Sequence, residues 1–216
     1  MQENPQVTGI ILKQSPVGEY DRVLTILTKE RGKIQAFARG ARKPNNRLSA
    51  MTTPLVFGTF KVYEGRTAYT IAEADIQNYF EELRMDYIGA CYGMYFAEVA
   101  GYYAQENNDE KELLKLLYQS LRALCKDALP NPLVRCIFEL RSIVINGEFP
   151  GIPNDYPLEE STVYALDYIV RSPIEKLYTF TVSDSVLTQL QQIAEKYMKR
   201  YVGENFKSLE VLQTLG

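Results

Sequence analysis

The chain has 216 residues and a formal net charge of −3, and 46% of its residues are hydrophobic. This length allows one large or two small domains with a buried core, and the composition is that of an ordinary globular protein. No apolar run reaches the roughly 18 residues that a membrane-spanning helix needs, and the first residues do not resemble a secretion signal. We therefore expect a cytoplasmic protein that does not contact a membrane.

The residue types argue against several classes of site. The chain contains three cysteines, Cys91, Cys125 and Cys136, and no histidine. A structural zinc site needs about four Cys or His ligands, and histidine is the usual general base. No Gly-rich phosphate loop of the type G-x-x-x-x-G-K follows a strand. We therefore expect no catalytic residue, no metal, no cofactor and no small-molecule substrate.

Positive charge is concentrated in the first part of the chain. Residues 1–80 contain eleven Lys or Arg against seven Asp or Glu, whereas residues 81–216 contain thirteen against twenty. Between residues 22 and 47, Glu30 is the only acidic residue. The eight cations there are Arg22, Lys29, Arg31, Lys33, Arg39, Arg42, Lys43 and Arg47. Such a cluster in an acidic chain indicates a polyanionic partner, because each phosphate neutralised by Lys or Arg releases counterions. We expect these cations to lie on one face and to bind DNA or RNA.

The first eighty residues have the pattern of short antiparallel strands. The runs rich in β-branched and aromatic residues are 7–13, 20–28, 33–39, 55–63 and 67–74. Gly and Pro mark turns at residues 14–19, 29–32 and 64–66, and a polar loop covers residues 40–54. Five short strands fit the oligonucleotide-binding (OB) barrel, although an SH3-like barrel gives a similar pattern. The loop at 40–47 would be a flexible basic segment able to wrap a nucleic-acid backbone.

The rest of the chain has helical periodicity. Helices are expected over residues 76–105, 110–129, 133–146, 161–170, 183–201 and 206–215, with an irregular segment at about 147–160. The fold class is therefore α+β, with a nucleic-acid-binding barrel at residues 1–78 and an α-helical domain at residues 79–216.

Three aromatic residues of the barrel are candidates for stacking on bases, namely Tyr20, Phe37 and Tyr63. Alternate residues of a strand face the core, so Phe37 fits a buried position as well. Glu19 and Asp21 resemble a pair of catalytic carboxylates, but such residues more often form turns.

Several segments together resemble the RecO family, the bacterial recombination mediators. At the N-terminal end these are Gly9–Lys13, Gly18-Glu19, Leu24–Gly32, Ala38–Pro44 and Arg47, and at the C-terminal end Tyr201–Leu209. The resemblance implies an N-terminal OB fold, an α-helical C-terminal domain and no catalytic site. It also implies binding and annealing of single- and double-stranded DNA.

The resemblance further implies partners and a location. The partners are RecR and the acidic tail of single-stranded DNA-binding protein, with which the family loads RecA in the RecF pathway. The location is the bacterial nucleoid. On the third helix, Arg135 and Arg141 are candidates for pairing with an acidic tail, although both also fit ordinary surface charges.

One departure from the family concerns zinc. Many members carry four cysteines between the middle helices and the last ones, whereas residues 147–181 contain none here. We therefore expect no zinc, and we expect the segment to be held by packing of Phe149, Ile152, Tyr156, Leu158 and Tyr164.

The alternative to a DNA-repair mediator is a protein-interaction adaptor whose barrel does not bind nucleic acid. The net negative charge favours this alternative. An enzyme would need a cleft of perturbed carboxylates or lysines, and the sequence displays none.

Overall fold

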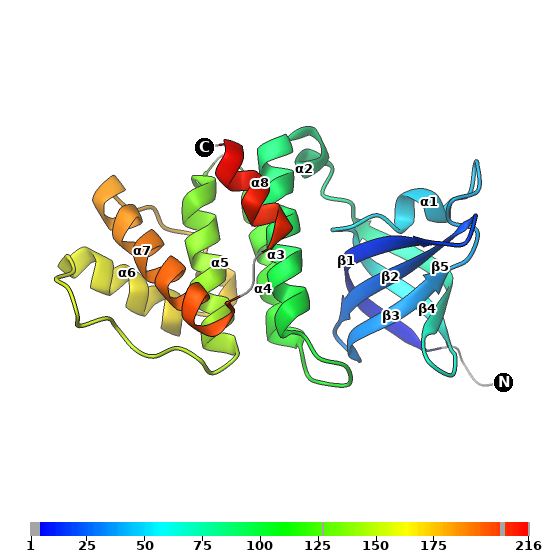
Figure 1. Ribbon diagram of the computed structural model, residues 1–216, viewed down its shortest axis with the longest axis horizontal. Helices are drawn as coiled ribbons and strands as arrows, with labels where there is room; N and C mark the ends of the chain where they lie inside the picture. The colour runs from blue at the N-terminus through cyan, green and yellow to red at the C-terminus, as the bar shows by residue number, and fades with distance from the viewer. Residues whose placement is uncertain (1–4, 127, 204–205, 216) are drawn as a thin grey trace.

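A computed structural model describes residues 5–126, 128–203 and 206–215, and it places a barrel beside a bundle of helices (Figure 1). The barrel strands are β1 (Gln6–Val17), β2 (Asp21–Thr28), β3 (Gly32–Ala38), β4 (Phe57–Glu64) and β5 (Tyr69–Asn78). They close in the order β1-β2-β3-β5-β4, with β3 and β5 parallel and the other pairs antiparallel. The predicted five-stranded OB-type barrel is confirmed.

The interior of the barrel follows the two-residue period of its strands. On β3, Ile34, Ala36 and Ala38 belong to the barrel core, whereas the alternate residues Lys33 and Phe37 are only half-buried and lie outside it. The outer face of β3 is therefore available to a ligand.

The first strand is longer than predicted, because it continues through Pro16 to Val17. The prediction of a turn at residues 14–19 placed the turn too early. Residues 6–10 of β1 pair with β4, and Gly9 and Ile10 among them also pair with β2, whereas Lys13 to Val17 pair with β2 alone. Proline has no N–H to donate, so it is tolerated on this free edge.

The helices are α1 (Leu48–Met51), α2 (Glu81–Met85), α3 (Tyr87–Tyr103), α4 (Lys111–Leu124), α5 (Asn131–Ile145), α6 (Glu160–Arg171), α7 (Asp184–Tyr201) and α8 (Lys207–Leu215), with a 3-10 turn at Ile174–Lys176. The prediction of one helix over residues 76–105 was wrong. Ile76 belongs to β5, and the chain is extended at Asp86, whose carboxylate accepts a hydrogen bond from the Ile88 N–H. None of the described helices is long and apolar enough to cross a membrane.

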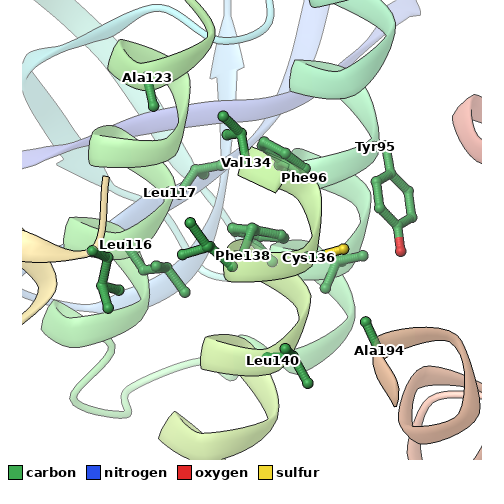
Figure 2. Close-up of a cluster of buried hydrophobic side chains, with 14 of the residues drawn as sticks. Tyr95, Phe96, Leu116, Leu117, Ala123, Val134, Cys136, Phe138, Leu140 and Ala194 are labelled. Carbon is green, nitrogen blue, oxygen red and sulfur yellow. The ribbon is translucent and has the colours of Figure 1, made fainter. Parts of the chain in front are cut away.

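The helical core is built where α3, α4 and α5 pack together (Figure 2). The rings of Phe96 on α3 and Phe138 on α5 stack with centroids 4.3 Å apart, and Leu117 of α4 lies beside them. On the far side of α5, Ala194 of α7 belongs to the same core.

The barrel and the helices share this core. Ile10, Leu12 and Leu27 are barrel residues that pack with the helical side chains rather than inside the barrel. Gly32 marks a close approach, because its φ is 62° and an added Cβ would lie 2.3 Å from the Gln105 carbonyl oxygen. Strand β5 ends at Asn78, and we propose a domain boundary between residues 78 and 79.

The cysteine-free segment after α5 is held only in part as predicted. Phe149, Tyr156 and Leu158 pack against the helical core. The prediction was wrong for Ile152 and Tyr164, which are 44% and 74% exposed. Polar contacts add to the packing, since the Tyr197 hydroxyl donates to the Gly151 carbonyl at 2.8 Å.

Candidate nucleic-acid interface

The eight basic residues lie at the two ends of the β2–β3 hairpin rather than in one cluster. Arg22 and Arg39 are at the end where β2 begins and β3 finishes, and Arg42, Lys43 and Arg47 follow in the connection to α1. Lys29, Arg31 and Lys33 are at the opposite end, in and after the turn that joins the two strands. Lys33 and Arg39 are six residues apart, so about 20 Å of strand separates the two groups.

The first group forms a surface that we call the loop site, consisting of Tyr20, Arg39, Arg42, Lys43 and Arg47. All five side chains are exposed, and the segment lies at the end of the barrel farthest from the helices (Figure 1). The Lys43 ammonium lies 5.5 Å from the centre of the Tyr20 ring. The loop site therefore presents four cations and one aromatic ring to solvent.

The chain of the loop site is fixed by hydrogen bonds, which differs from the flexible loop that we predicted. Asp21 accepts a hydrogen bond from the Gly40 N–H at 2.7 Å, so this carboxylate shapes a turn. The Arg42 N–H donates to the Tyr20 carbonyl at 2.8 Å, and its guanidinium donates to Gly18 at 3.2 Å. Ala41 is fully buried in the barrel core. The backbone that carries the cations is consequently held in place before any ligand binds.

Arg22 has a different environment from the rest of the first group. It is half-buried, and its Nη1 donates to the Ser49 carbonyl at 2.7 Å and to the Thr52 hydroxyl at 2.8 Å. Burial, and secondly the charge of Arg42, lower the pKa of the Arg22 guanidinium. Arg22 thus attaches α1 to the barrel and adds charge beneath the loop site.

The aromatic candidates Phe37 and Tyr63 lie on one row across the outside of the barrel. Phe37 pairs with Val23 of β2 and with Thr70 of β5, and Thr70 pairs in turn with Tyr63 of β4. Phe37 is half-buried but is not part of the barrel core, and Tyr63 is 53% exposed. Two rings are therefore available on the face between the two groups of cations.

The second group of cations lies where the barrel meets the helices. The Lys33 ammonium donates to the Gly101 carbonyl of α3 at 2.8 Å, and the Arg31 carbonyl accepts from the Asn107 N–H at 3.0 Å. Beside them is a hollow of about 230 Å³, which we call the junction hollow. It is lined by Arg31, Lys33–Gln35, Glu64–Tyr69, Glu106 and Asn107.

Sequence reasoning missed Arg66 of the junction hollow as a candidate. The signal was its place in the Glu64-Gly65-Arg66 turn, because the loop between the fourth and fifth strands is a ligand-binding loop of OB barrels. The turn is closed by a hydrogen bond from the Gly65 N–H to the Ala68 carbonyl at 3.1 Å.

Carboxylates do not neutralise these cations within the part of the chain that the structure describes. The ion pairs found there involve Lys61, Lys111, Lys115, Arg135, Arg171 and Lys196, and none of the eight basic residues of the hairpin and its loop. Glu30 lies between the two strands but accepts a hydrogen bond from the Thr8 N–H at 2.8 Å. The charges of the loop site are therefore free to attract phosphate.

Arg135 and Arg141 are not brought together on α5. The Arg135 Nε donates to Glu139 at 2.7 Å, and Tyr95 donates to the same buried oxygen at 2.6 Å. Arg141 instead donates to the carbonyls of Ile169 and Val170 at the end of α6. Burial lowers the pKa of Arg141, which fits a structural role between α5 and α6.

A groove of about 510 Å³ runs beside Arg135, between α3, α5, α7 and α8. Its lining is polar and apolar in about equal parts, with Lys199 and Glu195 as the other charged residues; the apolar residues are Tyr95, Met198, Val202, Phe206 and Leu209. Sequence reasoning named Arg135 but not Lys199. The groove therefore combines apolar side chains with two cations, Arg135 and Lys199.

Across residues 5–126, 128–203 and 206–215, no three His, Cys, Asp or Glu side chains gather in a way that could hold a metal ion. Cys125 and Cys136 are free cysteines, and burial raises the pKa of the Cys125 thiol to about 11.

Comparison with known proteins gives a consistent result over nearly the whole chain. A family model described as Recombination protein O N terminal matches residues 1–80, and one described as Recombination protein O C terminal matches residues 84–152 and 151–210. The chain is 30% identical to DNA repair protein RecO of Acetivibrio thermocellus, over 97% of this chain and 96% of the relative. The protein of the same name from Bacillus subtilis is 23% identical, over 96% of this chain and 93% of the relative.

Proposed function

Because this chain belongs to the RecO family of DNA repair proteins, we propose that it is a non-enzymatic mediator that binds single- and double-stranded DNA and promotes annealing. The observation that carries the proposal is the outer face of the barrel. There the row of Phe37, Thr70 and Tyr63 lies between two groups of cations that have no carboxylate partner among the described residues.

The geometry supports separate roles for the cations and for the aromatic rings. The fixed cations of the loop site contact phosphates, which supplies affinity that does not depend on sequence. The rings of Phe37 and Tyr63 stack on unpaired bases, which every base allows through its π-face. Because the cations lower the repulsion between two backbones, a second strand can approach and pair with the first.

The acidic tail of single-stranded DNA-binding protein is the partner that we assign to the groove beside Arg135. Arg135 and Lys199 attract carboxylates, and Tyr95, Met198 and Phe206 accept an apolar end. Arg135 already forms an ion pair with a carboxylate oxygen of Glu139. Lys199 therefore supplies the cation that is more available to the tail. We further propose that the protein acts with RecR to load RecA in the RecF pathway, and that DNA binding places it at the nucleoid.

Annealing of complementary strands tests this function, with and without a coating single-stranded DNA-binding protein. We expect the wild type to accelerate annealing and the variant Arg39→Glu/Arg42→Glu/Lys43→Glu to lose both annealing and DNA binding. Since the three side chains are exposed, the variant should keep the wild-type circular dichroism spectrum. A reversal of Lys126, exposed on the helical side, is the matched control and should leave both activities unchanged.

The alternative of an adaptor that does not bind DNA makes the opposite prediction. In that case the wild type shows no gel shift with single-stranded DNA at low salt, and the triple reversal changes nothing.

A further inference from the structure

The function proposed above assigns no specific ligand to the junction hollow. Three segments that are distant in sequence form it: the start of β3, the loop between β4 and β5, and the connection between α3 and α4. In Figure 1 these segments lie at the lower end of the barrel, opposite α1. The hollow therefore exists only when the barrel and the helices are joined.

The hollow continues the outer face of β3. Along this strand Lys33, Gln35 and Phe37 alternate with residues of the barrel core, and Arg39 directly follows the strand. Lys33 and Gln35 line the hollow, whereas Arg39 belongs to the loop site. Tyr63, on the aromatic row, directly precedes Glu64 of the hollow. A strand of DNA that stacks on Phe37 and Tyr63 therefore has the hollow at one end and the loop site at the other.

The charges of the hollow favour an anion by a small margin. Three cations line it, Arg31, Lys33 and Arg66, against the two carboxylates Glu64 and Glu106. The Lys33 ammonium is already engaged by the Gly101 carbonyl. Arg31 and Arg66 are the remaining donors, and neither forms an ion pair within the described ranges 5–126, 128–203 and 206–215.

We propose that the junction hollow binds one phosphodiester segment of single-stranded DNA through Arg31 and Arg66, so that the strand follows β3 from the loop site to the helices. This inference rests on the proposed function. It adds Arg66 as a contact residue. It also implies a minimum strand length, because a strand must reach from the loop site to the junction hollow to make every contact.

Neutralising the two arginines tests the contact. For single strands the slope of log affinity against log salt falls by about 0.7 for each phosphate contact that is lost. We expect Arg66→Gln and Arg31→Gln each to reduce this slope by about that amount and to weaken binding of a 20-nucleotide strand roughly three- to tenfold. The control Arg200→Gln, exposed on α7, should change neither quantity.

Two further measurements separate a phosphate contact from a loss of structure. Glu64→Gln removes a carboxylate from the same hollow, so it should tighten binding, which a damaged fold would not do. OB folds occupy about 4 to 16 nucleotides. Affinity should therefore rise between 4 and 16 nucleotides more steeply for the wild type than for Arg66→Gln, because a short strand can bind at the loop site alone.

The outcomes distinguish this proposal from the proposed function. If the wild type does not bind DNA, the proposed function fails and the hollow loses its ligand with it. If the wild type binds with a salt-dependent affinity but the glutamine variants keep the same slope and the same length dependence, only the hollow proposal is overturned.

Discussion

Phe37 of β3 and Tyr63 of β4 are both in register with the same residue, Thr70 of β5. Two strand spacings separate them, which is about 10 Å. Because neither ring is a member of the barrel core, both face the region between the loop site and the junction hollow. This arrangement makes the two rings neighbours on one surface although they are 26 positions apart in sequence.

Removing either ring should weaken the binding of single-stranded DNA more than the binding of duplex DNA. We expect Phe37→Ala or Tyr63→Ala to cost about 1–3 kcal/mol of binding free energy per stacked base. Bases in a duplex are not free to stack on a side chain, so duplex affinity should change less. Fluorescence anisotropy with labelled oligonucleotides measures both. Tyr63→Phe keeps the ring and should bind as the wild type does; equal losses on both substrates would argue against stacking.

Arg22 should affect stability more than DNA contact. In Arg22→Met the buried Thr52 hydroxyl and the Ser49 carbonyl lose their donor. We expect the free energy of unfolding to fall by about 1–3 kcal/mol, as measured by urea denaturation. DNA affinity of the folded variant should fall less than in the Arg39→Glu/Arg42→Glu/Lys43→Glu variant. A variant with wild-type stability would show that Arg22 does not secure α1.

Gly32 tests the junction between barrel and helices. A side chain there would meet the Gln105 carbonyl, and the φ of 62° disfavours any residue with a Cβ. We expect Gly32→Ala to lower the free energy of unfolding by more than about 1 kcal/mol. Gly18→Ala is a matched control, because Gly18 also has positive φ but no atom near its added Cβ. The difference between the two losses of unfolding free energy measures the steric clash at Gly32. Equal losses would exclude a tight junction between barrel and helices.

Arg135 and Glu139 form an ion pair on α5, and substitutions of the two residues should have strongly coupled effects on stability. Arg135→Met leaves the Glu139 carboxylate, which is 1% exposed, with Tyr95 as its only remaining hydrogen-bond partner among the described residues. Breaking a buried pair in this way costs about 3–5 kcal/mol. The double variant Arg135→Met/Glu139→Leu should recover a large part of that loss in thermal denaturation. Additive losses would mean that the two residues act independently.

The alternation of the strands made the barrel predictable. Ile34, Ala36 and Ala38 are inward residues of a strand that the pattern located to within one residue at each end. Ser183 caps α7 as expected, since its hydroxyl accepts a hydrogen bond from the Val186 N–H. The helix boundary near Ile76 was not predictable, because an apolar residue at the end of a strand also fits the first turn of a helix.

The candidate site was predictable by residue type but not by position. Sequence proximity placed Arg31 and Arg39 in one cluster, yet the hairpin sends them to opposite ends of the barrel. Conversely, Arg66 is brought beside Arg31 only by closure of the barrel, which no local pattern records. Local hydrogen bonds to Asp21 and Tyr20 also make the loop site rigid, although its sequence resembles that of a flexible loop.

The most direct test of the account is the salt dependence of single-stranded DNA binding by the wild-type protein. The four cations of the loop site together with Arg31 and Arg66 predict about six phosphate contacts, and hence a slope of log affinity against log salt of about −4. Substitution of Arg39, Arg42 and Lys43 by Glu removes three of these six contacts and should reduce the slope by at least about half. A slope near zero for the wild type, or an unchanged slope for the triple variant, would contradict the claim that these cations bind the phosphate backbone.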